Sequence, residues 1–228
     1  EEIGSFMASP VEIETEAVYE GDTYGSSMAP FYTVLALWVG GLILVAIIHT
    51  KVEMEPSFKN AKPHQQFFGR YITFFLIAQI QALITVLGDL YFIGIECAHP
   101  FLFWLAASCS SFVFGFLMYA LTAAFGNIGE GLAIIIMVIQ VAGAGCTFPI
   151  ETLPKVFQTF YRFQPFKYAM GAMKEAVAGM YQDDYWKDLA ILLSYTIISL
   201  IVGLVLAVPF RKLNHILEES KEKSGVML

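Results

Sequence analysis

Charge is scarce in this sequence. Only 14% of its 228 residues are charged, against about 25% in soluble domains. The hydrophobic share is 57%, above the about 45–50% that soluble domains contain. Acidic residues outnumber basic ones and the net charge is -7, which excludes a nucleic-acid binder that relies on a basic surface. The three cysteines, Cys97, Cys109 and Cys146, show no C-x-x-C spacing, so a zinc or redox site is not expected.

The sequence contains long runs of apolar residues without charge. A helix needs roughly 17–25 apolar residues to cross a bilayer, and five runs qualify: 29–48, 71–95, 101–125, 132–148 and 189–210. A soluble helical bundle would need polar faces at the helical period, and the third run has none. We therefore predict an all-α, polytopic membrane helix bundle with five spans. It divides into the end of an extracellular domain (1–28), a transmembrane domain (29–210) and a cytoplasmic tail (211–228).

Basic residues are unevenly divided between the two sides that five spans define. The connection 50–70 and the tail together hold eight Lys and Arg, whereas the opposite side has five, all between the fourth and fifth runs. Loops rich in Lys and Arg stay in the cytoplasm. We therefore expect an extracellular N-terminal segment and a cytoplasmic C-terminus.

The connection 50–70 has two interpretations. It could form an interfacial helix that begins at a proline, with aromatic and basic side chains at the membrane surface as a cytoplasmic docking surface. It could equally be a plain basic loop. The residues of the candidate coupling segment are Pro56, Phe58, Lys59, Phe67 and Arg70.

The segment between the fourth and fifth runs is neither a polar loop nor a full span. Prolines divide it, and we expect a short amphipathic helix over 154–163 and a longer one over 166–181. In the longer helix, apolar residues recur every three or four positions, which predicts one stripe: Phe166, Met170, Met173 and Val177. Lys167, Lys174 and Glu175 fall on other faces. Such a helix lies in the interface or dips into the membrane, as a gate or as an external lid without a transport role. The residues assigned to the candidate gate are Pro165, Phe166, Tyr168, Met170, Met173, Lys174 and Glu175.

Asp89 is the only charged side chain inside a predicted span. It lies about six residues from the outer end, hence roughly 9 Å deep at the helical rise. Glu96, seven positions later, would share its helix face, so both could line an outer vestibule; alternatively, Asp89 reaches the interface or pairs with a lysine of the external helices. Gln140 is expected to donate an interhelical hydrogen bond. Small residues of the first and third runs predict close helix packing: Gly40, Gly41, Ser108, Ser110, Ser111 and Gly115.

Motifs for catalysis or cofactor binding are absent from the sequence. G-x-x-x-x-G-K-[ST], H-E-x-x-H and G-x-S-x-G do not occur. The glycine-rich stretch 126–131 is predicted to be a tight turn between two spans, and the four histidines are scattered. We therefore expect no enzyme, no catalytic residue, no metal site and no cofactor. Nucleotide-driven transport would need an ATPase on another chain.

Two segments carry a family resemblance. Residues 25–45, GSSMAPFYTVLALWVGGLILV, are similar to the start of the C-terminal membrane domain of the YhgE/Pip (phage infection protein) family of mainly Gram-positive bacteria. Leu153-Pro154 and residues 164–175, QPFKYAMGAMKE, resemble a signature shared with the ABC transporter type-2 permease superfamily. Here Lys174 stands where arginine is commoner, and Lys167 replaces a small hydroxyl residue.

The resemblance implies a fold, a location and partners. It implies a bacterial plasma-membrane protein with a further span and a large extracellular domain upstream, making six spans with both ends in the cytoplasm. It also implies a cytoplasmic coupling helix over 50–70, re-entrant helices after the fifth span of the whole protein, and a homodimer in the lipid bilayer. Two functions follow: a permease-like exporter subunit with a separate ATPase, or an anchor for an ectodomain that serves as phage receptor or as a type VII-like secretion scaffold. Nucleic acid is not an expected partner.

Overall fold

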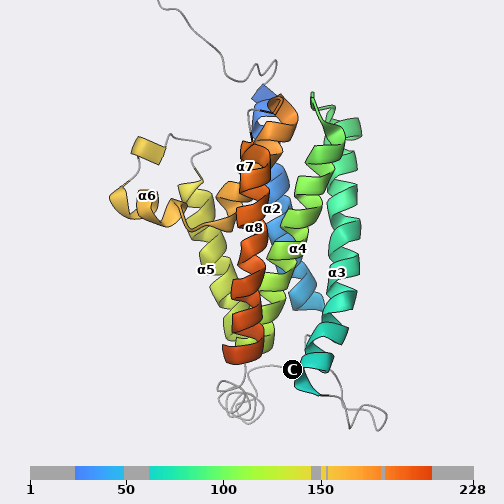
Figure 1. The fold of residues 1–228 in the computed structure, drawn as a ribbon, viewed down its shortest axis with the longest axis vertical. Coiled ribbons are helices and arrows are strands. Elements are labelled where there is room, and N and C mark those ends of the chain that lie inside the picture. Colours follow the sequence, from blue (N-terminus) through green and yellow to red (C-terminus); the bar gives the residue numbers. More distant parts are fainter. Residues whose placement is uncertain (1–23, 49–61, 145–149, 153, 181–182, 207–228) are drawn as a thin grey trace, which may run out of the picture.

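The computed structural model describes residues 24–48, 62–144, 150–152, 154–180 and 183–206 (Figure 1). Within these ranges the chain is helical and has no strand. The elements, in chain order, are α2 (Tyr24–Ile47), α3 (Pro63–Leu87), the π-helical η2 (Gly88–Ile93), α4 (Pro100–Phe125), α5 (Asn127–Gly143), the 3-10 turn η3 (Ile150–Thr152), α6 (Lys155–Tyr161), α7 (Pro165–Ala178), α8 (Asp184–Leu200) and the π-helical η4 (Ile201–Leu206). The predicted all-α membrane helix bundle is confirmed.

Proline and glycine set several of the helix ends. Pro63, Pro100 and Pro165 are the first residues of α3, α4 and α7, where the missing N–H has no helical partner to lose. Gly126, with φ of 59°, alone separates α4 from α5, and positive φ suits glycine because it has no Cβ. The turn expected over 126–131 is therefore tighter than predicted. A Cβ on Gly129 would lie 2.2 Å from the Leu121 carbonyl oxygen, so the two helices are in near contact from the start.

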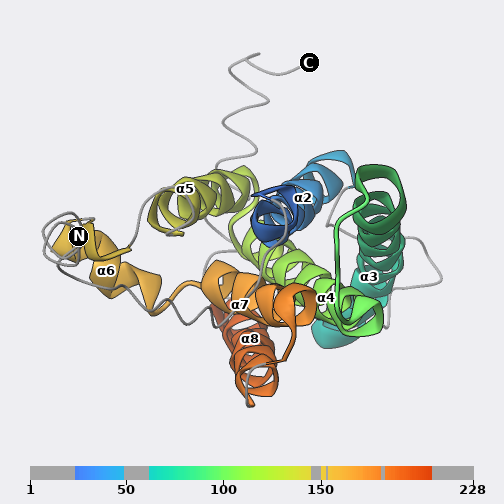
Figure 2. The same cartoon turned by 90° about the horizontal axis from the view of Figure 1, so that it is seen from above.

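Helix α4 is the centre of the bundle. It packs against α2, α3, α5, α7 and α8, and Figure 2 shows these helices arranged around it. Small residues allow this approach: a Cβ on Gly41 of α2 would lie 3.8 Å from the Cα of Gly115. Trp38 of α2 is fully buried, with its ring 4.8 Å from that of Phe114. These contacts agree with the close packing that the small residues predicted.

Side-chain hydrogen bonds join α3 to α4. Tyr71 donates to the Phe112 carbonyl (3.1 Å), Tyr119 donates to the Phe67 carbonyl (2.8 Å) and Ser111 donates to the Ala78 carbonyl (2.9 Å). Gln79 and Ser108 exchange two further hydrogen bonds. Because lipid tails offer no hydrogen-bond partner, polar side chains of membrane helices are satisfied within the protein.

Four of the described helical segments are long and apolar enough to cross a membrane: Tyr24–Ile47, His64–Ile93, Pro100–Phe125 and Asp184–Val205. Helix α5 is apolar but has only 17 residues, so the fifth crossing stays a prediction. The second segment starts earlier than the run 71–95 predicted, because Pro63 opens a helix that includes the charged Arg70. Phe67 consequently lies inside the bundle, 8% exposed, with its ring 4.9 Å from that of Tyr119, and its expected place at the membrane surface was wrong.

Candidate functional site

The residues of the candidate gate, 165–175, lie in α7, and the structure places this helix among the spans. It starts beside the end of α5, partway along the bundle, and runs to the end where α2 begins (Figure 1). It packs against α2, α4 and α8. Phe166, Met170 and Met173 are at most 4% exposed and Val177 is half-buried. The Phe166 ring meets that of Phe31 on α2 edge-on at 5.7 Å.

Burial of α7 extends beyond the predicted stripe. Glu175, which falls outside the apolar stripe, is nevertheless 6% exposed, whereas Lys174 is exposed. Three alanines outside the predicted stripe also have no exposed surface: Ala169, Ala172 and Ala176. Small side chains let helices approach on several sides at once, which explains why α7 is enclosed although its sequence shows one apolar stripe.

Gly171 of α7 lies next to the Asp188 side chain of α8. A Cβ at this position would lie 2.0 Å from Oδ2 of Asp188, so glycine makes room for that carboxylate. Asp188 also interacts electrostatically with Lys167, one turn before Gly171 on α7. The α7–α8 pair therefore depends on a residue without a side chain, which the stripe analysis missed. The spacing of Gly171 among nearby alanines was the signal for it.

The first turn of α7 is held by α5. The backbone N–H of Phe166 donates to Oε1 of Gln140 at 3.1 Å, and Gln140 is 1% exposed. Gln140 was expected to donate an interhelical hydrogen bond; it accepts one instead, because the free N–H groups at a helix start require acceptors. The Tyr168 hydroxyl donates to the Arg162 carbonyl at 2.7 Å, which fixes the corner between α6 and α7 just before Pro165.

The last turn of α7 is held by residues 94–99, which we call the strap. Its backbone N–H groups at Ala98 and His99 donate to the carbonyls of Val177 (3.0 Å) and Ala176 (2.9 Å). The Cys97 thiol also donates to the Ala176 carbonyl, at 3.4 Å. Burial raises the pKa of the Cys97 thiol. These bonds satisfy carbonyls that the end of a helix leaves free, and they close the bundle at this end.

Asp89 is joined to α2. Its Oδ2 accepts a hydrogen bond of 2.6 Å from the Thr33 hydroxyl, and the side chain is 8% exposed. Its partner thus lies on a neighbouring span and not in the external helices. The shared face with Glu96 was wrong, because Gly94 adopts φ of 71° and ends the helix before Glu96. The Glu96 backbone N–H instead donates to the Ser26 hydroxyl at 3.1 Å, which attaches the strap to α2.

The candidate coupling segment is only partly described. Pro56, Phe58 and Lys59 lie outside the described residues. Phe67 and Arg70 belong to α3, the first buried and the second half-buried. The structure therefore describes only these two of the five residues.

Among the described residues, no group of three or more His, Cys, Asp or Glu side chains could hold a metal ion. The site consists of α7 packed between three spans, with Gln140 bound to its first turn and the strap bound to its last turn.

Apolar helices of spanning length around a central helix, with a shorter helix packed into one end, define a multi-pass membrane protein. The family described as ABC-2 family transporter protein matches residues 5–207, and the chain belongs to this family of transporter membrane components. YhgE, an uncharacterized protein of Bacillus subtilis (strain 168), is 26% identical over 198 residues, which cover 87% of this chain. The chain spans about a quarter of that relative, 25% of its length. No solved structure matches the chain.

Proposed function

We propose that this chain is the membrane subunit of a type-2 ABC exporter-like system, and that it moves an envelope-related or amphipathic substrate across a bacterial plasma membrane. The observation that carries the proposal is the enclosure of α7 by α2, α4 and α8 at one end of the bundle. A helix that occupies the end of a bundle without crossing it is in position to open or close a path between the spans. Membership of the ABC-2 family supports the same role.

The energy source and the assembly are part of this proposal. The sequence has no phosphate-binding loop, so nucleotide would be hydrolysed by a separate ATPase that binds the coupling segment. We further propose a homodimer whose interface uses α2 and the external helices. Tyr32 and Ile43 on α2 are exposed, which leaves apolar surface on that helix for a second copy.

Co-purification tests the transport proposal. The tagged protein, solubilised in mild detergent, is expected to retain an ATPase subunit, and Lys59→Glu in the coupling segment is expected to release it. Lys187→Glu, on an exposed lysine of α8, is the matched control and should retain the partner. Recovery of no ATPase from cross-linked membranes would reject the transporter. Mass photometry tests the dimer, and a monomer in every detergent would exclude it.

A second candidate function is anchoring of a large ectodomain as phage receptor or secretion-system scaffold. The observation in its favour is that three quarters of the relative lie outside the aligned region. Recovery of secretion subunits in place of an ATPase would favour this role.

Topology is tested by labelling introduced cysteines in intact cells. With the proposed orientation, an impermeant thiol reagent should label a cysteine at Asp183 and should not reach one at Lys59 or Lys221. Labelling at Lys221 in sealed cells would contradict the orientation.

A further inference from the structure

Helix α6 projects away from the bundle. It packs mainly against α5 and η3 among the described elements, and Figures 1 and 2 show it standing to one side of the spans. Apolar side chains that would be buried in a soluble protein are exposed on α6 and just after it: Val156 (63%), Phe160 (54%) and Phe163 (71%). Val156 and Phe160 are four positions apart, so they lie on one helix face.

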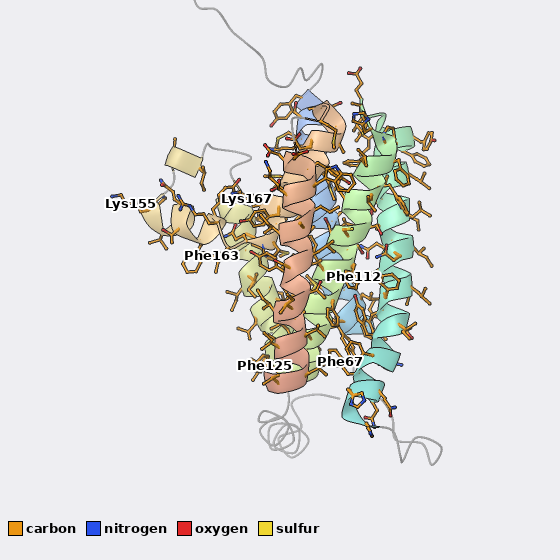
Figure 3. The ribbon with its side chains drawn as sticks, in the orientation of Figure 1. Phe67, Phe112, Phe125, Lys155, Phe163 and Lys167 are labelled. Carbon is orange, nitrogen blue, oxygen red and sulfur yellow. The ribbon has the colours of Figure 1, made fainter. Side chains whose placement is uncertain are left out.

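Cations accompany this apolar face. Lys155 and Arg162 are both exposed, and their spacing of seven places them together on a different face of the helix. Lys167, at the start of α7, holds its ammonium group 4.8 Å from the centre of the Tyr161 ring. Figure 3 shows Lys155 at the far end of α6 and Lys167 near the bundle, with Phe163 on the lower side.

This local charge differs from that of the rest of the chain. Between residues 154 and 174 there are four Lys and Arg and no Asp or Glu, although the whole chain has a net charge of -7. If the predicted orientation holds, these cations also lie on the outer side, where the positive-inside rule disfavours them. Such a concentration of positive charge is complementary to an anion.

The length of α5 places this surface near lipid. At 17 residues and a rise of 1.5 Å per residue, α5 is about 25 Å long, shorter than the hydrocarbon core of about 30 Å. As a predicted span, α5 would draw the bilayer surface toward its end, and α6 packs against α5. The outward face of α5 below it is apolar and exposed, with Ile135 and Val138 more than half accessible.

We propose that α6 and the first turn of α7 form a binding site for an anionic phospholipid. The phosphate group lies against Lys155 and Arg162, Lys167 adds positive charge on the side nearer the bundle, and an acyl chain follows Phe160, Phe163 and the outward face of α5. Amphipathic helices with a basic face bind anionic lipid surfaces in this way. The site requires insertion in a membrane but does not require transport, so its failure and that of the exporter proposal are separate results.

Thermal unfolding of the purified full chain in detergent, with added lipid, tests this site. Phosphatidylglycerol should raise the melting temperature, whereas phosphatidylcholine with the same acyl chains, and inorganic phosphate alone, should not. Removal of each cation should weaken apparent affinity about fivefold, so Lys155→Gln with Arg162→Gln should lose about 25-fold. Phe160→Gln should also weaken phosphatidylglycerol binding, because it removes the contact with the acyl chain.

The controls separate a specific site from general attraction to charge. Lys187→Gln removes one positive charge from an exposed position of α8 and should leave the affinity for phosphatidylglycerol within about twofold. Lys155→Arg with Arg162→Lys keeps both charges and should retain binding. These side chains are exposed, so the lipid-free melting temperatures should agree with the parent. Equal stabilisation by the two lipids, an equal loss in Lys187→Gln, or full stabilisation by inorganic phosphate would each overturn the proposal.

Discussion

Met173 is the most informative position for testing whether α7 belongs to the interior. Its side chain has no exposed surface, and α7 packs on three helices. Truncation of a buried methionine to alanine costs about 2–5 kcal/mol because it removes contacts and leaves a cavity. For a chain of this size, each kcal/mol lowers the melting temperature by about 2–4 °C. Met173→Ala should therefore melt about 4–20 °C below the parent.

Met173→Asp should be more damaging than the truncation. It adds a carboxylate in a site where burial of an unpaired polar group costs a further several kcal/mol, comparable with the whole margin of about 5–15 kcal/mol that holds many proteins folded. We expect loss of the folded protein or a fall in melting temperature well beyond that of Met173→Ala. The neighbouring Lys174 is exposed, so Lys174→Gln should stay within about 0.5 kcal/mol of the parent.

The assay is fluorescence-detected unfolding of the three variants and the parent in one detergent. An unchanged melting temperature for Met173→Asp would show that α7 lies on the outer surface, and the argument for a gate would then fail. Destabilisation of Lys174→Gln to the same extent as Met173→Asp would show that the assay reports fragility of the whole of α7 rather than burial of one face.

Three further predictions concern the contacts that hold α7. Gly171→Val should destabilise the protein by about 1–3 kcal/mol, the usual range for overpacking, because its Cβ meets the Asp188 carboxylate. Asp188→Gly in the same chain should restore part of the loss, and additive effects in a thermal double-mutant cycle would contradict the contact. Gln140→Leu should cost about 1–3 kcal/mol by leaving the buried Phe166 N–H without its acceptor, and unchanged stability would exclude this role. Burial raises the pKa of the Cys97 thiol, so the reactive thiolate is rarer than usual near pH 7. Maleimide labelling of Cys97 should therefore be slow at pH 7 and should rise only at more alkaline pH than labelling of an exposed cysteine. Labelling of Cys97 at the rate of an exposed control cysteine would contradict the burial.

The helices could be predicted from the sequence because they follow from composition. Long runs without charge have one stable form in a bilayer, the helix, since it satisfies its own backbone groups. The apolar stripe of α7 could also be predicted, because the spacing of apolar residues and the type of each side chain are local properties of the sequence. Its boundaries differ by a few residues, since α7 ends at Ala178 where Gly179 adopts φ of 102°.

Contacts between helices could not be predicted from the sequence in this way. Gln140 as an acceptor for α7 and Thr33 as the partner of Asp89 join residues 26 and 56 positions apart, and no local pattern encodes such pairings. Phe67 was assigned to the surface because charged neighbours surround it in sequence, whereas the rotation of α3 turns it toward α4. The burial of Glu175 depends on α8, which closes the face of α7 that its own sequence leaves polar.

The strap has a consequence for how α7 can move. Its hydrogen bonds to the last turn of α7 and to Ser26 of α2 make that end of α7 part of the same rigid unit as the start of α2. The opposite end is held by side-chain contacts, the Gln140 hydrogen bond and the Phe166–Phe31 ring contact, and starts at Pro165, which lacks a backbone N–H. Any displacement of α7 that leaves the strap intact is therefore a rotation about the strap end, with the largest travel at Pro165 and α6. The travelling end is the one that carries the basic and aromatic side chains, so a lipid bound there would act on the end of α7 that lies farthest from the strap.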